Sequence, residues 1–188
     1  MPELTFDKEN HSYFLDGRII PSVTQILTQS GILDKRFFKP GAAERGTRVH
    51  SLCEQIANGE PPEEENGYTE AFKSFLKDAR IEPVATEHIG YSSSGFAGTI
   101  DLIASFRGET AIFDVKTGVY QEWWPLQLAG YALLLENENI RRFSLEIKDT
   151  GKYKLTEYKN NNEDIGGFLN AFDVYKELYC KGFADFAI

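Results

Sequence analysis

The chain of 188 residues has few cysteines, no long apolar run and fewer basic than acidic residues. Its two cysteines, Cys53 and Cys180, lie far apart and lack the spacing of metal ligands. This argues against a disulfide scaffold, a zinc site and an iron–sulfur cluster, and we expect two buried thiols. The first ten residues are charged, and the longest apolar run, at about residues 131–135, is too short to span a bilayer. We therefore expect a soluble cytoplasmic protein with no membrane partner.

The net charge of −9 argues at first against a nucleic-acid partner, because lysine and arginine drive the binding of phosphates. The charge is unevenly distributed, however, and six glutamates lie between Glu54 and Glu70. Basic residues gather elsewhere, at Lys35, Arg36, Lys39, Arg45 and Arg48 and again at Arg141, Arg142, Lys148, Lys152, Lys154 and Lys159. The local sign of the charge therefore leaves a nucleic-acid partner open.

Length and an apolar content of 41% predict one folded domain. A capping-box pattern that begins at Ser22 and the apolar periodicity of later segments predict helices over residues 22–29, 42–57, 69–80, 125–136 and 164–181. Strands are predicted as a short pair within residues 4–20, a meander over 84–91, 97–106 and 110–117, and a hairpin over 143–148 and 153–158. This order is typical of a mixed α/β or α+β fold.

Two aspartates and a lysine stand out in GTIDLIASFRGETAIFDVKTG. If Arg107-Gly108 is a two-residue hairpin loop, Asp101 lies directly opposite Asp114, and both share one face of the sheet with Lys116. Opposed carboxylates destabilise a strand pair, and a divalent cation with oxygen ligands would relieve the repulsion. Taken alone, the pattern favours the simpler alternative, a salt bridge between the lysine and the aspartates at a solvated sheet edge.

Other polar residues before and after this stretch favour the metal site over the salt bridge. His50 lies in GTRVH on a predicted helix, and imidazole binds Mn²⁺ and is tolerated beside Mg²⁺. Gln127 and Tyr131 in QLAGY lie four residues apart, on one face of a predicted helix. Each of these residues alone is explained more simply by packing or surface exposure.

Taken in order, GTRVH, GTID, DVK and QLAGY resemble the motifs of the PD-(D/E)XK nuclease superfamily, in its RecB-like, phage-type exonuclease branch. IPSVTQIL further resembles the P-S-V-T element of phage-type exonucleases and of the mitochondrial genome maintenance exonuclease. The resemblance implies a restriction-endonuclease-like core with a central mixed sheet flanked by helices. It implies a single nuclease domain over residues 1–188, with an N-terminal hairpin and helix (about residues 1–40) packed on the core.

The resemblance also implies roles for individual residues. The implied metal ligands for Mg²⁺ or Mn²⁺ are His50, Asp101, Asp114, the Val115 backbone carbonyl and Glu87. The implied catalytic residues are Lys116, Asp114 and Asp101, with Gln127 and Tyr131 in support. The candidate DNA contacts are Ser22, Arg45, Arg48, Trp123, Trp124 and Tyr131, although Ser22 is also explained by helix capping and the tryptophans by core packing. The chain lacks the cysteine cluster of the relatives that bind an iron–sulfur cluster.

The leading hypothesis is a metal-dependent deoxyribonuclease that hydrolyses phosphodiester bonds from single- or double-stranded DNA ends, in recombination, repair or replication. Its implied mechanism is in-line attack by a water whose pKa a bound metal lowers, with help from Lys116. Two alternatives stay open. The first is a structure-specific or restriction-type endonuclease of the same fold, and the second is a catalytically silent nucleic-acid-binding subunit.

Overall fold

The structure is a computed structural model that describes residues 2–34 and 40–179. Its helices are α1 (Val23–Gln29), α2 (Ala42–Ala57), α3 (Gly67–Asp78), α4 (Trp124–Leu134) and α5 (Asn161–Tyr179). Its strands are β1 (Leu4–Asp7), β2 (Ser12–Leu15), β3 (Arg18–Ile20), β4 (Glu82–Ser92), β5 (Phe96–Phe106), β6 (Glu109–Lys116), β7 (Arg141–Ile147) and β8 (Tyr153–Tyr158). Among the described residues no helix is both long and apolar enough to span a membrane.

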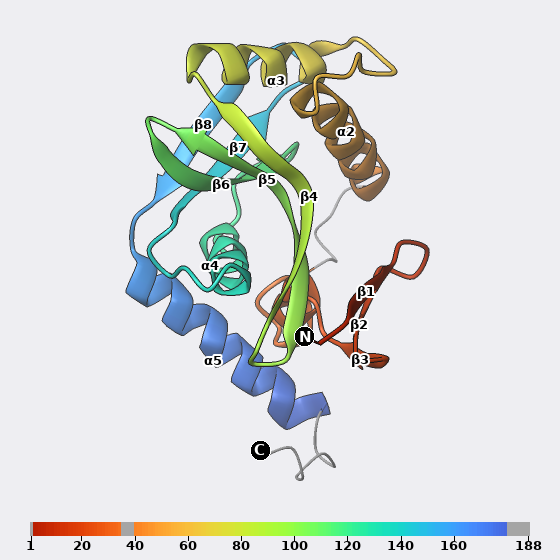
Figure 1. Cartoon of the computed structure of the whole chain (residues 1–188), viewed down its shortest axis with the longest axis vertical. Coiled ribbons are helices and arrows are strands. Elements are labelled where there is room, and N and C mark those ends of the chain that lie inside the picture. The colour runs from red at the N-terminus through yellow and green to blue at the C-terminus, as the bar shows by residue number, and fades with distance from the viewer. Residues whose placement is uncertain (1, 35–39, 180–188) are drawn as a thin grey trace.

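The larger sheet has the strand order β4-β5-β6-β7-β8. Strands β6 and β7 are parallel, and the other neighbours are antiparallel. A parallel pair needs a crossover connection, and α4 provides it. In Figure 1 helices α3 and α2 lie at the top, α4 lies near the centre below the β6–β8 part of the sheet, and α5 lies below α4, with the small β1-β2-β3 sheet to one side. The predicted class, a mixed sheet flanked by helices, is confirmed.

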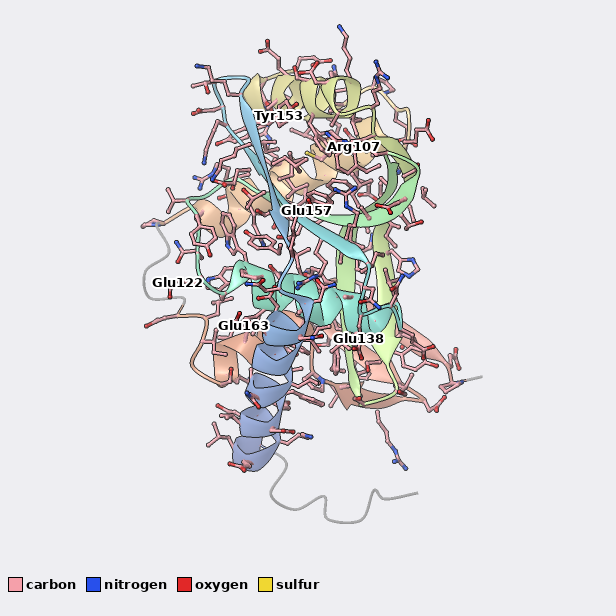
Figure 2. The ribbon with its side chains drawn as sticks, turned by 90° about the vertical axis from the view of Figure 1, so that its left-hand side faces the viewer. Arg107, Glu122, Glu138, Tyr153, Glu157 and Glu163 are labelled. Atoms are coloured by element: carbon pink, nitrogen blue, oxygen red, sulfur yellow. The ribbon has the colours of Figure 1, made fainter. Side chains whose placement is uncertain are left out.

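Apolar side chains fill both faces of the larger sheet. Phe72 and Phe75, three residues apart on α3, share a cluster with Phe113 and Phe143 of the sheet, and the Phe113 and Phe143 rings stack 5.0 Å apart. The second cluster joins the buried faces of α1, α4 and α5. Figure 2 shows β8 from the outside, with Tyr153 near α3 and Glu157 toward the start of α5. The two cores hold α2 and α4 in place, and these are the helices that carry the site.

The β5–β6 hairpin turns at Arg107-Gly108, as predicted. Both residues have positive φ angles, 57° and 81°, as a type I′ turn requires. The paired residues run from the turn to Leu102 opposite Phe113 and stop one step before Asp101. There the Asp101 Oδ2 accepts a hydrogen bond of 2.7 Å from the Val115 N–H. The strands therefore diverge at the aspartates, and a side chain replaces the next backbone contact.

The structure changes some predicted elements. Residues 4–20 form three strands rather than two, because the chain turns a second time at Asp16-Gly17, where both φ angles are positive. The third helix begins at Gly67, two residues early, because Asn66 caps its first N–H groups. Cys53 is a free buried thiol, whereas Cys180 and the predicted end of the last helix lie outside the described residues.

Candidate active site

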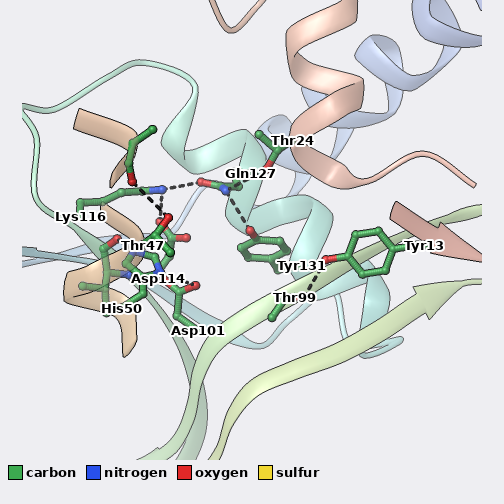
Figure 3. A network of polar contacts seen from close by, with 12 residues as sticks. Tyr13, Thr24, Thr47, His50, Thr99, Asp101, Asp114, Lys116, Gln127 and Tyr131 are labelled. Carbon is green, nitrogen blue, oxygen red and sulfur yellow. Dashed lines mark hydrogen bonds and ion pairs between the residues drawn. The ribbon is translucent and has the colours of Figure 1, made fainter. Parts of the chain in front are cut away.

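The site forms where β5 and β6 diverge, between α2 and α4 (Figure 3). Strand β6 ends in Asp114-Val115-Lys116, and the Asp114 and Lys116 side chains project to the same side of the sheet. The side chains that meet here come from four elements: Asp101 from β5, Asp114 and Lys116 from β6, His50 from α2, and Gln127 and Tyr131 from α4. Local packing explains how each helix reaches this point.

The apolar face of α2 consists of Val49, Leu52 and Cys53, which are buried at helical spacing. His50 flanks this stripe and therefore lies at the edge of the buried face, beside the end of β6. Gly98 of the GTID motif and Gly130 of the QLAGY motif let α4 pack closely against β5 and α1. A Cβ atom at Gly98 would lie 3.2 Å from Tyr131 Cε1, and one at Gly130 would lie 2.8 Å from a methyl carbon of α1. These glycines thus allow close packing around α4.

Lys116 is held from three directions. Its Nζ lies 2.5 Å from Asp114 Oδ2 and donates a 2.6 Å hydrogen bond to Gln127 Oε1. The ammonium also lies 4.9 Å from the centre of the Trp123 ring and 5.6 Å from that of Trp124, within the range of cation–π attraction. The side chain is 13% exposed. The position of this positive charge is therefore well defined at the mouth of the site.

Gln127 links Lys116 to a buried tyrosine (Figure 3). Its Nε2 donates to Tyr131 Oη at 2.9 Å and to Thr24 Oγ1 at 3.5 Å. Because a lysine ammonium can only donate, the amide oxygen must face Lys116 and the amide nitrogen must face Tyr131. Burial raises the pKa of Tyr131 well above its ordinary value, and nearby carboxylates add to the shift. The tyrosine is therefore a neutral partner that fixes the orientation of Gln127.

His50 joins the ends of both strands. Its Nε2–H donates to the Val115 carbonyl oxygen at 2.9 Å, and its Nδ1 lies 3.4 Å from Asp101 Oδ1. Burial alone would lower the pKa of His50, but the charge and hydrogen bond of Asp101 outweigh it and raise the pKa to about 9. Burial likewise would raise the pKa of Asp101, and the imidazolium lowers it instead. Without a metal the two groups form an ion pair.

Asp114 is the most buried carboxylate of the site, at 2% exposure. Burial raises its pKa to about 6; Lys116 works against this shift, and Asp101 adds to it. Its Oδ2 has the Lys116 ammonium beside it but no further hydrogen bond among the described residues. Burying a carboxylate is unfavourable unless an opposite charge compensates it, and the Lys116 ammonium supplies that charge.

Glu87 lies close to His50 and Asp101 and forms a cluster of potential metal ligands with them. One ligand atom each of His50, Glu87 and Asp101 can be chosen so that all three lie within 4.8 Å of one another. Burial raises the pKa of Glu87 to about 7, and Asp101 adds to the shift. The residue has a φ of 44°, which is rare for a non-glycine residue and is typical of functional sites. The structure therefore brings Glu87 to the site by a backbone conformation that a regular strand lacks.

A small cavity lies beside this cluster. It is lined by His50, Glu54, Glu87 and Asp101, and its volume of about 10 Å³ has room for about one water-sized particle. Carboxylates with one imidazole are suitable ligands for Mn²⁺ and Mg²⁺. The donor set of the cluster fits a divalent cation, whereas Asp114, a predicted ligand, neither belongs to this cluster nor lines the cavity. Glu54, four residues after His50 on α2, also lines the cavity but is not part of the cluster of potential ligands.

Some predicted DNA contacts have other roles. Ser22 caps α1, since its Oγ accepts from the Gln25 N–H at 3.0 Å. The Arg48 guanidinium is paired with the Glu64 carboxylate. Trp124 is only 2% exposed, so its position has a simpler explanation than contact with a base, and base stacking stays a prediction. Core packing, the alternative explanation, accounts for it.

A groove of about 510 Å³ opens beside the site. Its lining includes Arg45, His50, Lys116, Val119, Trp123 and Lys148. Arg45 and Trp123 were predicted as DNA contacts. Lys148 belongs to the second basic stretch of the sequence, and its position just after β7, the parallel neighbour of β6, places it here. The groove is thus the basic counterpart of the acidic cavity.

No protein-family model and no curated protein sequence matches the chain. Two solved structures that resemble it in fold are of LHK-Exo, an alkaline exonuclease from Laribacter hongkongensis. The structure of its complex with dAMP has 13% sequence identity and a TM-score of 0.49, and the match covers 86% of this chain and 88% of that chain. The other has 12% identity and a TM-score of 0.43, and the match covers 84% and 89%.

Proposed function

We propose that the chain is a metal-dependent DNA nuclease of the PD-(D/E)XK superfamily, with the whole chain as one nuclease domain. The observation that carries this proposal is the buried Asp114–Lys116 pair beside the cluster of His50, Glu87 and Asp101. An isolated salt bridge at a solvated edge would need neither the second buried aspartate nor the histidine. The motif resemblance in GTRVH, GTID, DVK and QLAGY supports the same assignment.

The residues that would hold Mg²⁺ or Mn²⁺ are Asp101, Asp114, His50, the Val115 carbonyl and Glu87. Bound there, a divalent cation would neutralise charge on the scissile phosphate and lower the pKa of a water molecule for in-line attack. The pKa values of Glu87 and Asp114 are raised, so a cation that binds to these carboxylates would displace their protons. His50 must lose one proton for the same reason.

Lys116 supplies a fixed positive charge beside the attacked phosphate. Because Gln127 and Asp114 already hold the ammonium, little reorganisation is needed when negative charge develops in the transition state. Gln127 acts through Lys116, and Tyr131 acts through Gln127. Both are therefore positioning residues, and Lys116 is the catalytic residue of this group.

The finer proposal is an exonuclease that acts at DNA ends in recombination, repair or replication, as the phage-type motifs imply. The test uses end-labelled linear DNA, single- and double-stranded, and closed circular DNA, each with Mg²⁺, Mn²⁺ or EDTA. We expect linear DNA to be degraded with metal only and circles to persist. Cleavage of circles would favour the endonuclease. No cleavage with either metal would overturn the nuclease proposal in favour of a binding subunit.

The variants Asp114→Asn and Lys116→Ala test the site itself. Asp173→Asn is the matched control, because Asp173 forms an exposed ion pair with Lys176 on α5, outside the site. We expect both site variants to lose cleavage and the control to keep it, with all three folded by circular dichroism. If both site variants digest DNA like the parent, the catalytic assignment is wrong.

A further inference from the structure

The basic groove next to the site has the chemistry of a nucleic-acid binding surface, and the following inference rests on the proposed function. Three of its lining groups, His50, Val115 and Lys116, belong to the candidate active site. Whatever lies in the groove therefore lies next to the proposed scissile position. Its basic side chains, Arg45, Lys116 and Lys148, suit an anionic ligand in a chain whose net charge is −9.

Arg45 lacks an ion-pair partner among the described residues. Its Nε is buried and without a hydrogen bond, although the side chain lines the groove. Arg48, one turn further along α2, is engaged by Glu64 instead. A guanidinium with unused donors is suited to bidentate binding of a phosphate. The two arginines, both on α2, thus differ in availability, and Arg45 is the one that can bind a backbone phosphate.

Lys148 shapes another part of the groove. Its Nζ donates to the Gly118 carbonyl at 2.6 Å, which ties the end of β7 to the loop that follows β6. The ammonium has two further N–H groups for an anion. The same loop continues with Val119, which is 72% exposed and lines the groove. Together with the partly buried Trp123 it adds apolar surface of the kind that nucleobases pack against.

The size of the groove limits the ligand. A volume of about 510 Å³ lies within the roughly 300 to 1,000 Å³ that encloses drug-sized molecules. The groove therefore has room for one or a few nucleotides of one strand. Cationic groups for phosphates and apolar groups for bases line the same space.

We infer that this groove binds a single unpaired nucleic-acid strand, with Arg45 and Lys148 on its phosphates and Val119 and Trp123 against its bases. The substrate class of the proposed nuclease is then a single-stranded end, and a blunt duplex must fray before it enters. Arg48 has no part in this binding.

The test is equilibrium binding of a fluorescein-labelled single-stranded oligonucleotide and of a blunt hairpin duplex of equal length, in EDTA so that neither is cleaved. The full chain is compared with Arg45→Gln, Lys148→Gln and the matched control Arg48→Gln over a series of salt concentrations. We expect tighter binding of the single strand, and affinity for it about tenfold weaker in Arg45→Gln. Each groove variant should also reduce the salt slope by about 0.7, the value for one phosphate contact on a single strand. Arg48→Gln should match the parent in both respects.

The outcomes separate this inference from the proposed function. If the parent shows no metal-dependent cleavage but binds with the expected pattern, the nuclease proposal fails and the groove assignment is supported. If the parent cleaves DNA but Arg45→Gln and Lys148→Gln bind like Arg48→Gln, the groove assignment is overturned. Equal binding of the blunt hairpin and the single strand would also overturn it.

Discussion

His50 Nε2 donates a 2.9 Å hydrogen bond to the Val115 carbonyl oxygen, and both residues line the acidic cavity as well as the basic groove. On one side of this contact lie Glu87 and Asp101, and on the other lies Lys116. The proposed cation in the cavity and the proposed nucleic-acid strand in the groove would therefore lie on opposite sides of this hydrogen bond. The contact also orients the imidazole, since a histidine that ligates a metal commonly donates its other N–H to a carbonyl.

The role of Lys116 predicts a large and specific loss of rate. In Lys116→Met the fixed positive charge beside Asp114 disappears, and we expect the cleavage rate to fall by about 10²- to 10³-fold, as for the loss of one preorganised transition-state donor. Initial rates on end-labelled DNA measure this. Lys154→Met is the control, because Lys154 also pairs with a carboxylate, that of Glu146, but is 67% exposed. Equal loss in both variants would argue against a catalytic role.

The raised pKa of Glu87 predicts a pH-dependent stability in the absence of metal. Its ordinary value of 4.5 rises to about 7 in the folded protein, so the folded state binds the proton more tightly. That contribution is fully present below about pH 4.5 and is lost as the pH rises through 7. Glu87→Gln removes this titration. In EDTA, the Tm of the parent minus that of Glu87→Gln should therefore decrease from about pH 4.5 to 7.

Thermal unfolding over this pH range checks the prediction about Glu87. Glu82→Gln is the control, because Glu82 is exposed at the start of the same strand. The control measures the effect of removing an exposed carboxylate from the same strand. A flat difference for Glu87→Gln would mean that Glu87 titrates in the folded protein as it does in the unfolded chain.

Metal binding should reverse the direction in which thermal stability changes with pH. Mn²⁺ must displace protons held by Asp114 and Glu87, with pKa values of about 6 and about 7, and one held by His50, at about 9. The rise in Tm on adding Mn²⁺ should therefore be small near pH 5 and larger near pH 8. Saturation at about 100 times the Kd would stabilise the fold by about 2.7 kcal/mol. An equal rise at both pH values, or the same rise in the double variant Asp101→Asn, Asp114→Asn, would contradict this site.

The sequence predicted those parts of the site that depend on local rules. The Ser22 capping box begins α1 as expected, and Arg107-Gly108 forms the predicted turn. The two-residue turn determines the register of the pairs from the turn to Leu102 opposite Phe113, but the strands diverge one step before Asp101 would lie opposite Asp114. Helical spacing predicted that Gln127 and Tyr131 share a face, and they are hydrogen bonded.

Other parts depend on contacts between distant segments, which no local pattern encodes. The left-handed conformation of Glu87 interrupts a strand that reads as regular in sequence. Lys148 reaches the groove only because β7 lies parallel to β6. Trp123 and Trp124 are adjacent in sequence, but only packing around α4 decides that the second is buried. Tertiary packing rather than residue type determines these roles.

The motif glycines predict opposite effects of one added methyl group. Gly46 lies inside α2, and no described atom lies within 4 Å of the place a Cβ would take, so Gly46→Ala should raise the free energy of unfolding by up to about 1 kcal/mol. At Gly130 a Cβ would lie 2.8 Å from Val23 Cγ1 and 2.9 Å from Phe168 Cε2. Overpacking costs about 1–3 kcal/mol and outweighs the same helix gain.

Denaturant unfolding of both variants measures the difference. Gly130→Ala should also move α4 relative to the sheet and so reduce cleavage, because Gln127 and Tyr131 lie on the same helix. Gly46→Ala is the control, because it adds the same methyl group to a helix at a position with open space. A Gly130→Ala protein as stable as Gly46→Ala would mean that α4 can shift without loss of packing. The close approach of α1 and α5 would then not be what holds Gln127 against Lys116.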